Sequence, residues 1–238
     1  YAWEQIADAR GEVIIPAGRH ARFDVEDEAA GDLGWLSGVG DGIHTLNLPK
    51  DPVRDAQLAH LANLGSLRHL DLSDTPVTDA GLAHLNRLTE LRRLNLENTG
   101  ITDAGMSQLA GLTQLVYLNL LGTRVGDAGL AHVAGMPSMH EIDLESTRVG
   151  DAGLEHLRNL SEMTRLWLGR TNTGDAGLAN FAGMRELSEI DLRETRITDS
   201  GILNLKDCSR LRILHLSGTA VTRDGARELK RALPICFM

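Results

Sequence analysis

The chain has 238 residues, of which 42% are hydrophobic and 24% charged, so it encodes an ordered protein rather than a disordered tail. Its formal net charge of −9 argues against a nucleic-acid-binding protein, because such proteins present a basic face to the phosphate backbone. No apolar run approaches the roughly 20 residues that a membrane-spanning helix needs. The two cysteines, Cys208 and Cys236, exclude a disulfide-stapled secreted scaffold.

Residues 1–43 show no internal repeat and are predicted to form an N-terminal cap. Trp3 and Ile6 indicate a helix-like start, Val13–Ile15 a strand, and Arg22–Val25 a possible second strand before a glycine-rich approach to the next region. The chain begins at Tyr1 instead of an initiator methionine, so we expect a processed protein or a piece of a longer one. The compartment stays unknown, although the lack of disulfide-bonded caps favours the cytoplasm.

From residue 44 the sequence repeats every 24 residues without an insertion or deletion. An apolar-x-Leu triplet occurs eight times, and 39 of the 238 residues are leucine. The core is therefore expected to be built mainly from leucine side chains. A threonine and an Asp-x-Gly keep the same period. The triplets begin at residues 46, 70, 94, 118, 142, 166, 190 and 214.

Within one unit the hydrophobic period changes from two to three. The Leu-x-Leu alternation predicts a short strand with one buried face, and the three-residue spacing from Leu82 to Leu91 predicts a short helix or 3₁₀ segment. Asp79 stands where an N-cap is expected, and Gly81 allows neighbouring coils to approach. Because stacked strands lie about 4.8 Å apart and packed helices about 8–10 Å apart, the array is predicted to curve with its strands inside.

These columns resemble the leucine-rich-repeat family, in the 24-residue threonine-containing form common in bacterial repeat proteins, and more distantly the repeats of F-box substrate receptors. The resemblance covers about residues 44–238. It implies an α/β fold: a right-handed solenoid, or horseshoe, with eight parallel strands on the concave face and short helices on the convex face. Threonine replaces the asparagine or cysteine of the common form, so its hydroxyl is expected to bond the turn backbone. We divide the chain into a cap (1–43), eight repeats (44–225) and a C-terminal cap (226–238).

The side chains that invite a catalytic or metal-binding interpretation also have simpler explanations. One convex column contains His60, His84, His132 and His156. Neighbouring units are about 10 Å apart on this side, whereas a zinc–nitrogen bond is only about 2.0–2.1 Å long, so two neighbouring imidazoles are not expected to bind the same ion. The aspartates of Asp-x-Gly are expected to cap helices instead of binding calcium. Cys208 occupies a leucine column and is expected to be a core residue. We therefore predict no enzyme, no catalytic residue, no metal and no cofactor.

The concave face varies most among the units, in three outward rows on which we expect the fold to demand nothing. Trp167 lies there with Arg165 on its own strand and Arg193 on the next, and these residue types dominate interface hot spots. An exposed tryptophan packed by arginine stems is the simpler alternative. The predicted partner-binding residues are Trp167, Arg165, Arg193, Tyr117, Leu121, Asp143, Asp191 and Arg93.

The sequence is best explained by a non-enzymatic module that binds a protein or peptide on its concave sheet, which the resemblance supports. The partners are expected to include neither nucleic acid nor membrane, and the oligomeric state is unknown. The alternative is a sensory or substrate-recruiting segment of a larger signalling protein or enzyme.

Overall fold

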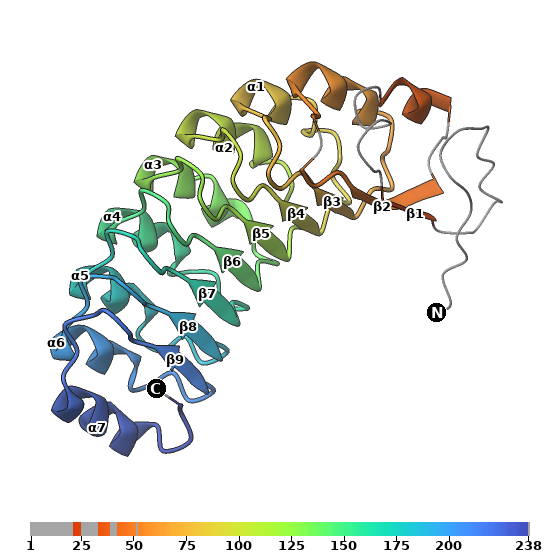
Figure 1. The fold of residues 1–238 in the computed structure, drawn as a ribbon. Coiled ribbons are helices and arrows are strands. Elements are labelled where there is room, and N and C mark those ends of the chain that lie inside the picture. The colour runs from red at the N-terminus through yellow and green to blue at the C-terminus, as the bar shows by residue number, and fades with distance from the viewer. Residues whose placement is uncertain (1–20, 25–32, 39–41, 51, 238) are drawn as a thin grey trace.

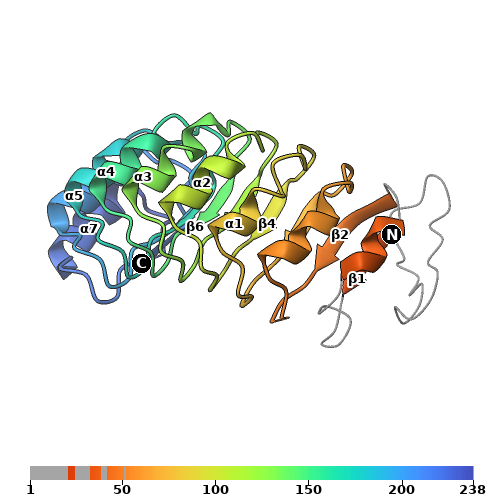
Figure 2. The same ribbon diagram turned by 90° about the horizontal axis from the view of Figure 1, so that it is seen from above.

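A computed structural model describes residues 21–24, 33–38, 42–50 and 52–237. Nine parallel strands form one sheet in chain order, and helical segments cover its outer side along the whole array (Figure 1). Seen from above, the helices again lie in a layer separate from the strands (Figure 2). The predicted fold class, a right-handed α/β solenoid with a concave parallel sheet and convex helices, is confirmed.

The elements alternate regularly. The strands are β1 (Ala21–Asp24), β2 (Ile43–Asn47), β3 (His69–Asp71), β4 (Arg93–Asn95), β5 (Tyr117–Asn119), β6 (Glu141–Asp143), β7 (Arg165–Trp167), β8 (Glu189–Asp191) and β9 (Ile213–His215). The α-helices are α1 (Asp79–Leu82), α2 (Asp103–Leu109), α3 (Asp127–Leu130), α4 (Asp151–Leu154), α5 (Asp175–Leu178), α6 (Asp199–Ile202) and α7 (Arg223–Ala232). The 3₁₀ segments are η1 (Leu33–Gly38), η3 (Asp55–Leu61), η4 (Val133–Gly135), η5 (Glu155–Leu157), η6 (Ala179–Phe181) and η7 (Leu203–Leu205).

The leucine columns form one continuous core between the strand layer and the helix layer. From β2 onward, each strand residue pairs with the residue 24 positions later, as Leu118 does with Ile142 and Leu166 with Ile190. These side chains are fully buried. Because one unit cannot bury both of its flanks alone, the stacking of units supplies the core.

The recurring threonine, present in seven of the eight units, closes the turn after the strand. Its hydroxyl donates a hydrogen bond to the carbonyl oxygen three residues earlier, as Thr99 does to Leu96 and Thr147 to Leu144, both at 2.6 Å. The same bond occurs at Thr75, Thr123, Thr171, Thr195 and Thr219. The expected bond between threonine and turn backbone is therefore confirmed.

A residue with left-handed backbone dihedrals recurs immediately before this threonine, and in the first unit before Asp51, a feature that the sequence analysis did not identify. In all units but the last, its N–H donates to a carbonyl oxygen of the next coil, as Asn98 does to Leu121 at 2.8 Å, which prolongs the ladder beyond the strand. Only two of the eight positions are glycine, which adopts a positive φ without strain. The positions, with φ between 53° and 76°, are Lys50, Asp74, Asn98, Gly122, Ser146, Arg170, Glu194 and Gly218.

The predicted helix-capping role of the Asp-x-Gly aspartates is wrong. The N-cap is the preceding residue, such as Thr102, and Asp103 is already the first residue of the helix. The carboxylate instead reaches the following coil: Asp79 accepts the N–H of Thr102 at 2.8 Å and its hydroxyl at 2.6 Å. We call this set the inter-coil aspartates: Asp55, Asp79, Asp103, Asp127, Asp151, Asp175 and Asp199.

The two ends add structure beyond the eight predicted strands. The expected strand near Arg22 is present as β1 and pairs in parallel with β2, so the sheet has nine described strands instead of eight. The helix-like start and the strand predicted at 13–15 lie outside the described residues. At the other end, α7 crosses the proposed 225/226 boundary, and Phe237 forms a parallel bridge with Ile213. The domain bounds stay a prediction. In the described part of the chain, no helix is long and apolar enough to cross a bilayer.

Candidate functional site

The concave face is formed by the outward residues of each strand, which the strand register aligns into rows. The first row runs from Arg22 through Thr45, His69, Arg93 and Tyr117 to Glu141, and onward to Arg165, Glu189 and Ile213. The middle row contains Asp143 and, beside it on the next strand, Trp167. Six of the predicted partner-binding residues belong to β4–β8, and the other two, Leu121 and Arg193, lie two residues after the ends of β5 and β8.

The expectation that the fold demands nothing of these rows is wrong for the middle row. In five units an aspartate or asparagine there accepts the backbone N–H of the residue two positions later, which closes the end of its own strand as an Asx turn. The bonds, at 2.9–3.1 Å, join Asp71 to Ser73, Asn95 to Glu97, Asn119 to Leu121, Asp143 to Glu145 and Asp191 to Arg193.

Trp167 interrupts this structural column between Asp143 and Asp191. An indole ring cannot accept the bond that the other units make, and the residue two positions later is Gly169. The tryptophan is half-buried on the concave side, whereas Leu166 and Leu168 beside it are fully buried in the core. The unit has therefore exchanged a turn-closing side chain for a large aromatic surface.

Ion pairs flank Trp167 on both sides. In the first row, Arg165 lies between Glu141, at 3.2 Å, and Glu189, at 3.7 Å. Beyond the strand ends, Arg193 pairs with Asp191 and Glu145, the latter at 3.7 Å. Arg165 is thus oriented by carboxylates of its two neighbouring strands, and Arg193 is oriented by Asp191 of its own strand and by Glu145, which follows β6. About half of each arginine side chain stays exposed.

The two predicted aspartates differ from the exposed ligands that the sequence analysis expected. The side chain of Asp191 is only 1% exposed and accepts the Nε–H of Arg193 at 2.7 Å, so it positions that arginine instead of facing a partner. Asp143 is half-buried beside Trp167. Burial, followed by the negative charges of Glu145, Glu97 and Asp191, raises the pKa of Asp143 to about 6 despite the N–H of Glu145 that it accepts.

The predicted second anchor lies two strands from Trp167. Tyr117 is half-buried, and the guanidinium of Arg93 lies 4.1 Å from the centre of its ring. Burial and the charge of Asp143 raise the pKa of the Tyr117 hydroxyl. Leu121 is half-buried after the same strand. Seven of the eight predicted residues are therefore at least partly exposed on the concave side, whereas Asp191 is buried; Arg93 and Tyr117 are in direct contact.

The convex candidates have surroundings that fit a structural role. Cys208 is fully buried, and burial raises the pKa of its thiol to about 11, as expected for a core residue. His60, His84, His132 and His156 are half-buried near the helical segments. Within the described residues, no three histidine, cysteine, aspartate or glutamate side chains form a group suited to hold a metal ion.

Comparisons with known proteins identify related repeats. The family model described as "Leucine Rich repeat" matches residues 66–85 and 88–110. Internalin C2 of Listeria monocytogenes has a TM-score of 0.66 and 26% identity, over 80% of this chain and 74% of that chain. Internalin InlF of the same organism has a TM-score of 0.64 and 21% identity, over 84% of this chain and 68% of that chain.

A third similar structure is a plant peptide hormone receptor, RGFR1, solved in complex with RGF2. It has a TM-score of 0.58 and 15% identity, over 94% of this chain but only 35% of the receptor. At this identity the likeness concerns the fold alone, as it does for InlF. A search by sequence among curated proteins gives no match.

Proposed function

Because the chain belongs to the leucine-rich-repeat proteins, we propose that it is a module that binds a protein or peptide partner on its concave sheet, with Trp167 at the centre of the binding surface. The concave rows offer the exposed variation that recognition needs, while the core side repeats in every unit. A repeat solenoid presents an extended concave surface suited to such a partner.

The observation that carries the proposal is the replacement of the turn-closing residue by Trp167. Five other units keep an aspartate or asparagine at this position and gain a backbone hydrogen bond from it. Such a bond contributes about 0.5–1.5 kcal/mol to stability. A unit that forgoes the bond and presents a half-exposed indole has a surface better explained by binding than by folding, since tryptophan is enriched at interface hot spots.

The surroundings of Trp167 support the same assignment. Arg165 and Arg193 are held on either side by carboxylates, so they lose little side-chain entropy when a partner binds. Tyr117 and Leu121 form a second apolar anchor two strands away, which corresponds to roughly 10 Å across the sheet. One extended peptide or one small protein face is able to contact both anchors.

We further propose that the module is not an enzyme. The carboxylates closest to Trp167 already have structural partners: Asp143 bonds its own turn, and Glu145 pairs with Arg170 and Arg193. Such an arrangement orients the arginines and closes the strands, which is a structural use of these carboxylates and not a catalytic one.

The decisive variant is Trp167→Asn, because asparagine restores the Asx turn while it removes the indole. Wild-type protein serves as bait to isolate a partner, and the affinity of the purified partner is then measured for both proteins. Loss of a central aromatic residue is expected to cost about 2 kcal/mol or more, roughly thirtyfold in affinity. His132→Ala on the convex side is the control and is expected to bind as wild type. If Trp167→Asn binds normally while the convex variant does not, the proposed face is wrong.

A further inference from the structure

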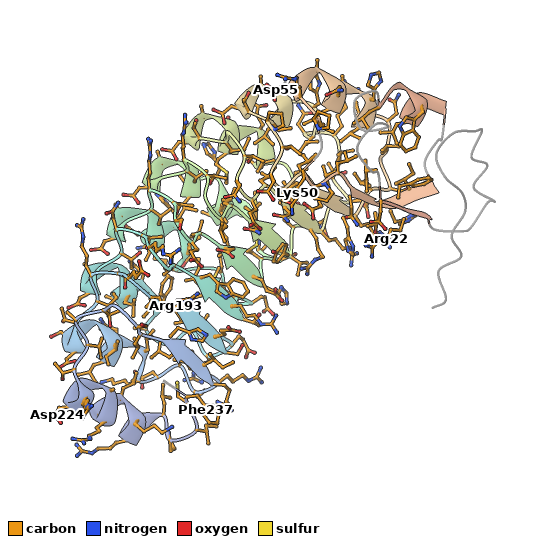
Figure 3. The ribbon with its side chains drawn as sticks, in the orientation of Figure 1. Arg22, Lys50, Asp55, Arg193, Asp224 and Phe237 are labelled. Atoms are coloured by element: carbon orange, nitrogen blue, oxygen red, sulfur yellow. The ribbon has the colours of Figure 1, made fainter. Side chains whose placement is uncertain are left out.

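A cluster of basic residues lies at the strand starts of β1–β4, apart from Trp167. It consists of Arg22, Arg68, His69, Arg92 and Arg93, which we call the arginine edge. Arg22, His69 and Arg93 share the first row, in which Thr45 separates Arg22 from His69. Arg68 and Arg92 immediately precede His69 and Arg93. Figure 3 shows Arg22 on the inner side of the array, at its N-terminal end.

The positive charge of this edge is mostly uncompensated. Arg22 pairs with Asp24 at 3.1 Å, but Arg68, Arg92 and Arg93 form no ion pair with any described residue. The effect is visible at His69, whose pKa is lowered by burial and then by the charges of Arg93, Arg68, Arg92 and Arg22. Among the described residues, three of the four arginines of the edge thus lack an ion-pair partner, in a chain whose net charge is −9.

The contrast with the other arginines of the concave face is sharp. Arg165 contacts carboxylates of both neighbouring strands, and Arg193 contacts Asp191 and Glu145. Arg93 instead stacks on Tyr117, with 4.1 Å between its guanidinium and the ring centre, and this contact leaves its N–H groups available. The Nε atom of Arg68 is buried without a hydrogen-bond acceptor among the described residues. Within the described part of the chain, Arg68 and Arg93 therefore present guanidinium N–H groups that have no side-chain acceptor.

We propose that the arginine edge binds an acidic segment of a polypeptide partner, whose aspartate or glutamate carboxylates accept hydrogen bonds from Arg68, Arg92 and Arg93. Guanidinium groups match carboxylates in geometry and form paired, charge-assisted bonds with them. The inference rests on the proposed function in one respect, namely that the natural ligand is a polypeptide. It adds the chemistry of that ligand and a second contact area.

The size and borders of the edge favour a short acidic segment over a long polyanion. From β1 to β4 the sheet advances three strand spacings, about 14 Å, which an extended peptide covers with about four residues. Carboxylates border the edge in two directions: Asp71 and Glu97 at the far ends of β3 and β4, and Glu141 further along the first row. A nucleic acid that continued past the edge would meet these like charges.

The test uses the full chain and a fluorescein-labelled oligoglutamate peptide of about six residues, with the matching oligoglutamine peptide as the neutral probe. Binding is measured by fluorescence anisotropy at low and at physiological ionic strength. The variant is Arg92→Gln/Arg93→Gln. Its control, Arg124→Gln/Arg148→Gln, changes the net charge equally at exposed arginines outside the edge. Circular dichroism checks that both variants melt as wild type does.

The proposal expects preferential binding of oligoglutamate, weakening with added salt, and a loss of about tenfold in the edge variant but not in the control. Trp167→Asn is expected to bind oligoglutamate normally, so a failure of the proposed Trp167 site would be distinguishable from a failure of this one. Equal losses in both double variants, equal binding of the two peptides, or tighter binding of a single-stranded oligonucleotide of the same charge would overturn the proposal.

Discussion

The two faces of the same sheet follow different rules. Toward the core, most units repeat the same apolar columns, the same threonine bond and the same inter-coil aspartate, so the bonds of one coil predict those of the next. Toward the concave side, a turn-closing aspartate or asparagine occurs in the middle row on both sides of Trp167, which replaces it in one unit. The comparison teaches that Trp167 differs from the other concave residues by its departure from a structural column and not by its exposure alone.

The hydrogen bonds of the inter-coil aspartates also divide the array into two kinds of coil. Four inter-coil aspartates bond both the N–H and the hydroxyl of a threonine in the next coil, as Asp175 does with Thr198 at 2.8 and 2.6 Å. Three others, in the middle of the array, meet a glycine and bond its N–H alone, as Asp127 does with Gly150 at 2.7 Å. The central coils therefore have one fewer bond at each junction.

The largest expected effect contrasts two neighbours on β7. Leu166→Ala is expected to destabilise the protein by about 2–5 kcal/mol, because it leaves a cavity in a fully buried column. Trp167→Asn, one residue away on the opposite face, is expected to change the free energy of unfolding by no more than about 1 kcal/mol, since the new Asx bond offsets the lost packing. Urea unfolding of both variants measures the difference. Equal destabilisation would show that Trp167 serves the fold.

Most of the fold was predictable from the sequence because its bonds repeat at a fixed interval. Leucines that recur every 24 residues require a strand register of 24, and the threonine column required a turn with a common bond. The ninth strand, β1, breaks this rule because it belongs to no repeat, and its pairing with β2 depends on tertiary contact. The left-handed position was missed because only Gly122 and Gly218 among its eight occupants indicate a positive φ.

The concave position of the candidate residues was predictable from the sequence, but their contacts were not. The Asp-x-Gly pattern at a helix start is the same whether the aspartate caps its own helix or bonds the next coil. Which of the two bonds forms depends on the position of the neighbouring coil, which the local sequence does not give. Asp191 was likewise expected to face a partner, yet the structure buries it beneath Arg193. The ion pairs of Arg165 could have been predicted from the sequence, because Glu141, Arg165 and Glu189 alternate in charge at the 24-residue interval.

The second prediction concerns the junctions between coils. Asp175→Ala is expected to cost about 1.5–3 kcal/mol, because it leaves the N–H and the hydroxyl of Thr198 without their charged acceptor. Asp127→Ala removes one such bond and is expected to cost about 0.5–1.5 kcal/mol. The control is Asp224→Ala, whose carboxylate pairs only with Arg227 at the surface and is expected to change stability by less than about 0.5 kcal/mol.

The same variants test the structural role of these aspartates against a calcium site. Added calcium is expected to leave the melting temperature of the wild-type protein unchanged, because each carboxylate already accepts backbone N–H groups. A calcium-dependent rise in melting temperature that Asp127→Ala abolishes would contradict the inter-coil role.

The third prediction uses the raised pKa of Asp143. The carboxyl group binds its proton more tightly in the folded protein, with a pKa of about 6, than in the unfolded chain, with a pKa of 3.8. Its contribution to stability is therefore present below pH 3.8 and is lost as the pH rises through about 6. Asp143→Asn keeps the oxygen that closes the turn but cannot ionise. We expect the variant to be more stable than wild type by about 1–3 kcal/mol above pH 7, with the gain vanishing near pH 4. A gain independent of pH would refute this titration.

The smallest expected effect concerns two glycines in one central coil. Gly126 occupies the position where other units have threonine, and its φ of −126° equals that of Thr102, so a side chain causes no backbone strain. A Cβ there would lie 3.4 Å from an oxygen of Asp103, at ordinary contact distance. We expect Gly126→Thr to stabilise the protein by about 0.5–1 kcal/mol, through a hydroxyl bond to Asp103 and a less flexible unfolded chain.

A substitution at Gly129, three residues later, is expected to have the opposite effect on stability. A Cβ at this position would lie 2.7 Å from an oxygen of Asp103 and 2.9 Å from the side chain of Val125, so the coils would have to separate. Gly129→Ala is therefore expected to destabilise the protein, even though alanine favours helix more than glycine does. Thermal unfolding of the two variants beside wild type measures both signs. Stabilisation by both substitutions would mean that helix propensity, and not the close approach of neighbouring coils, governs this column.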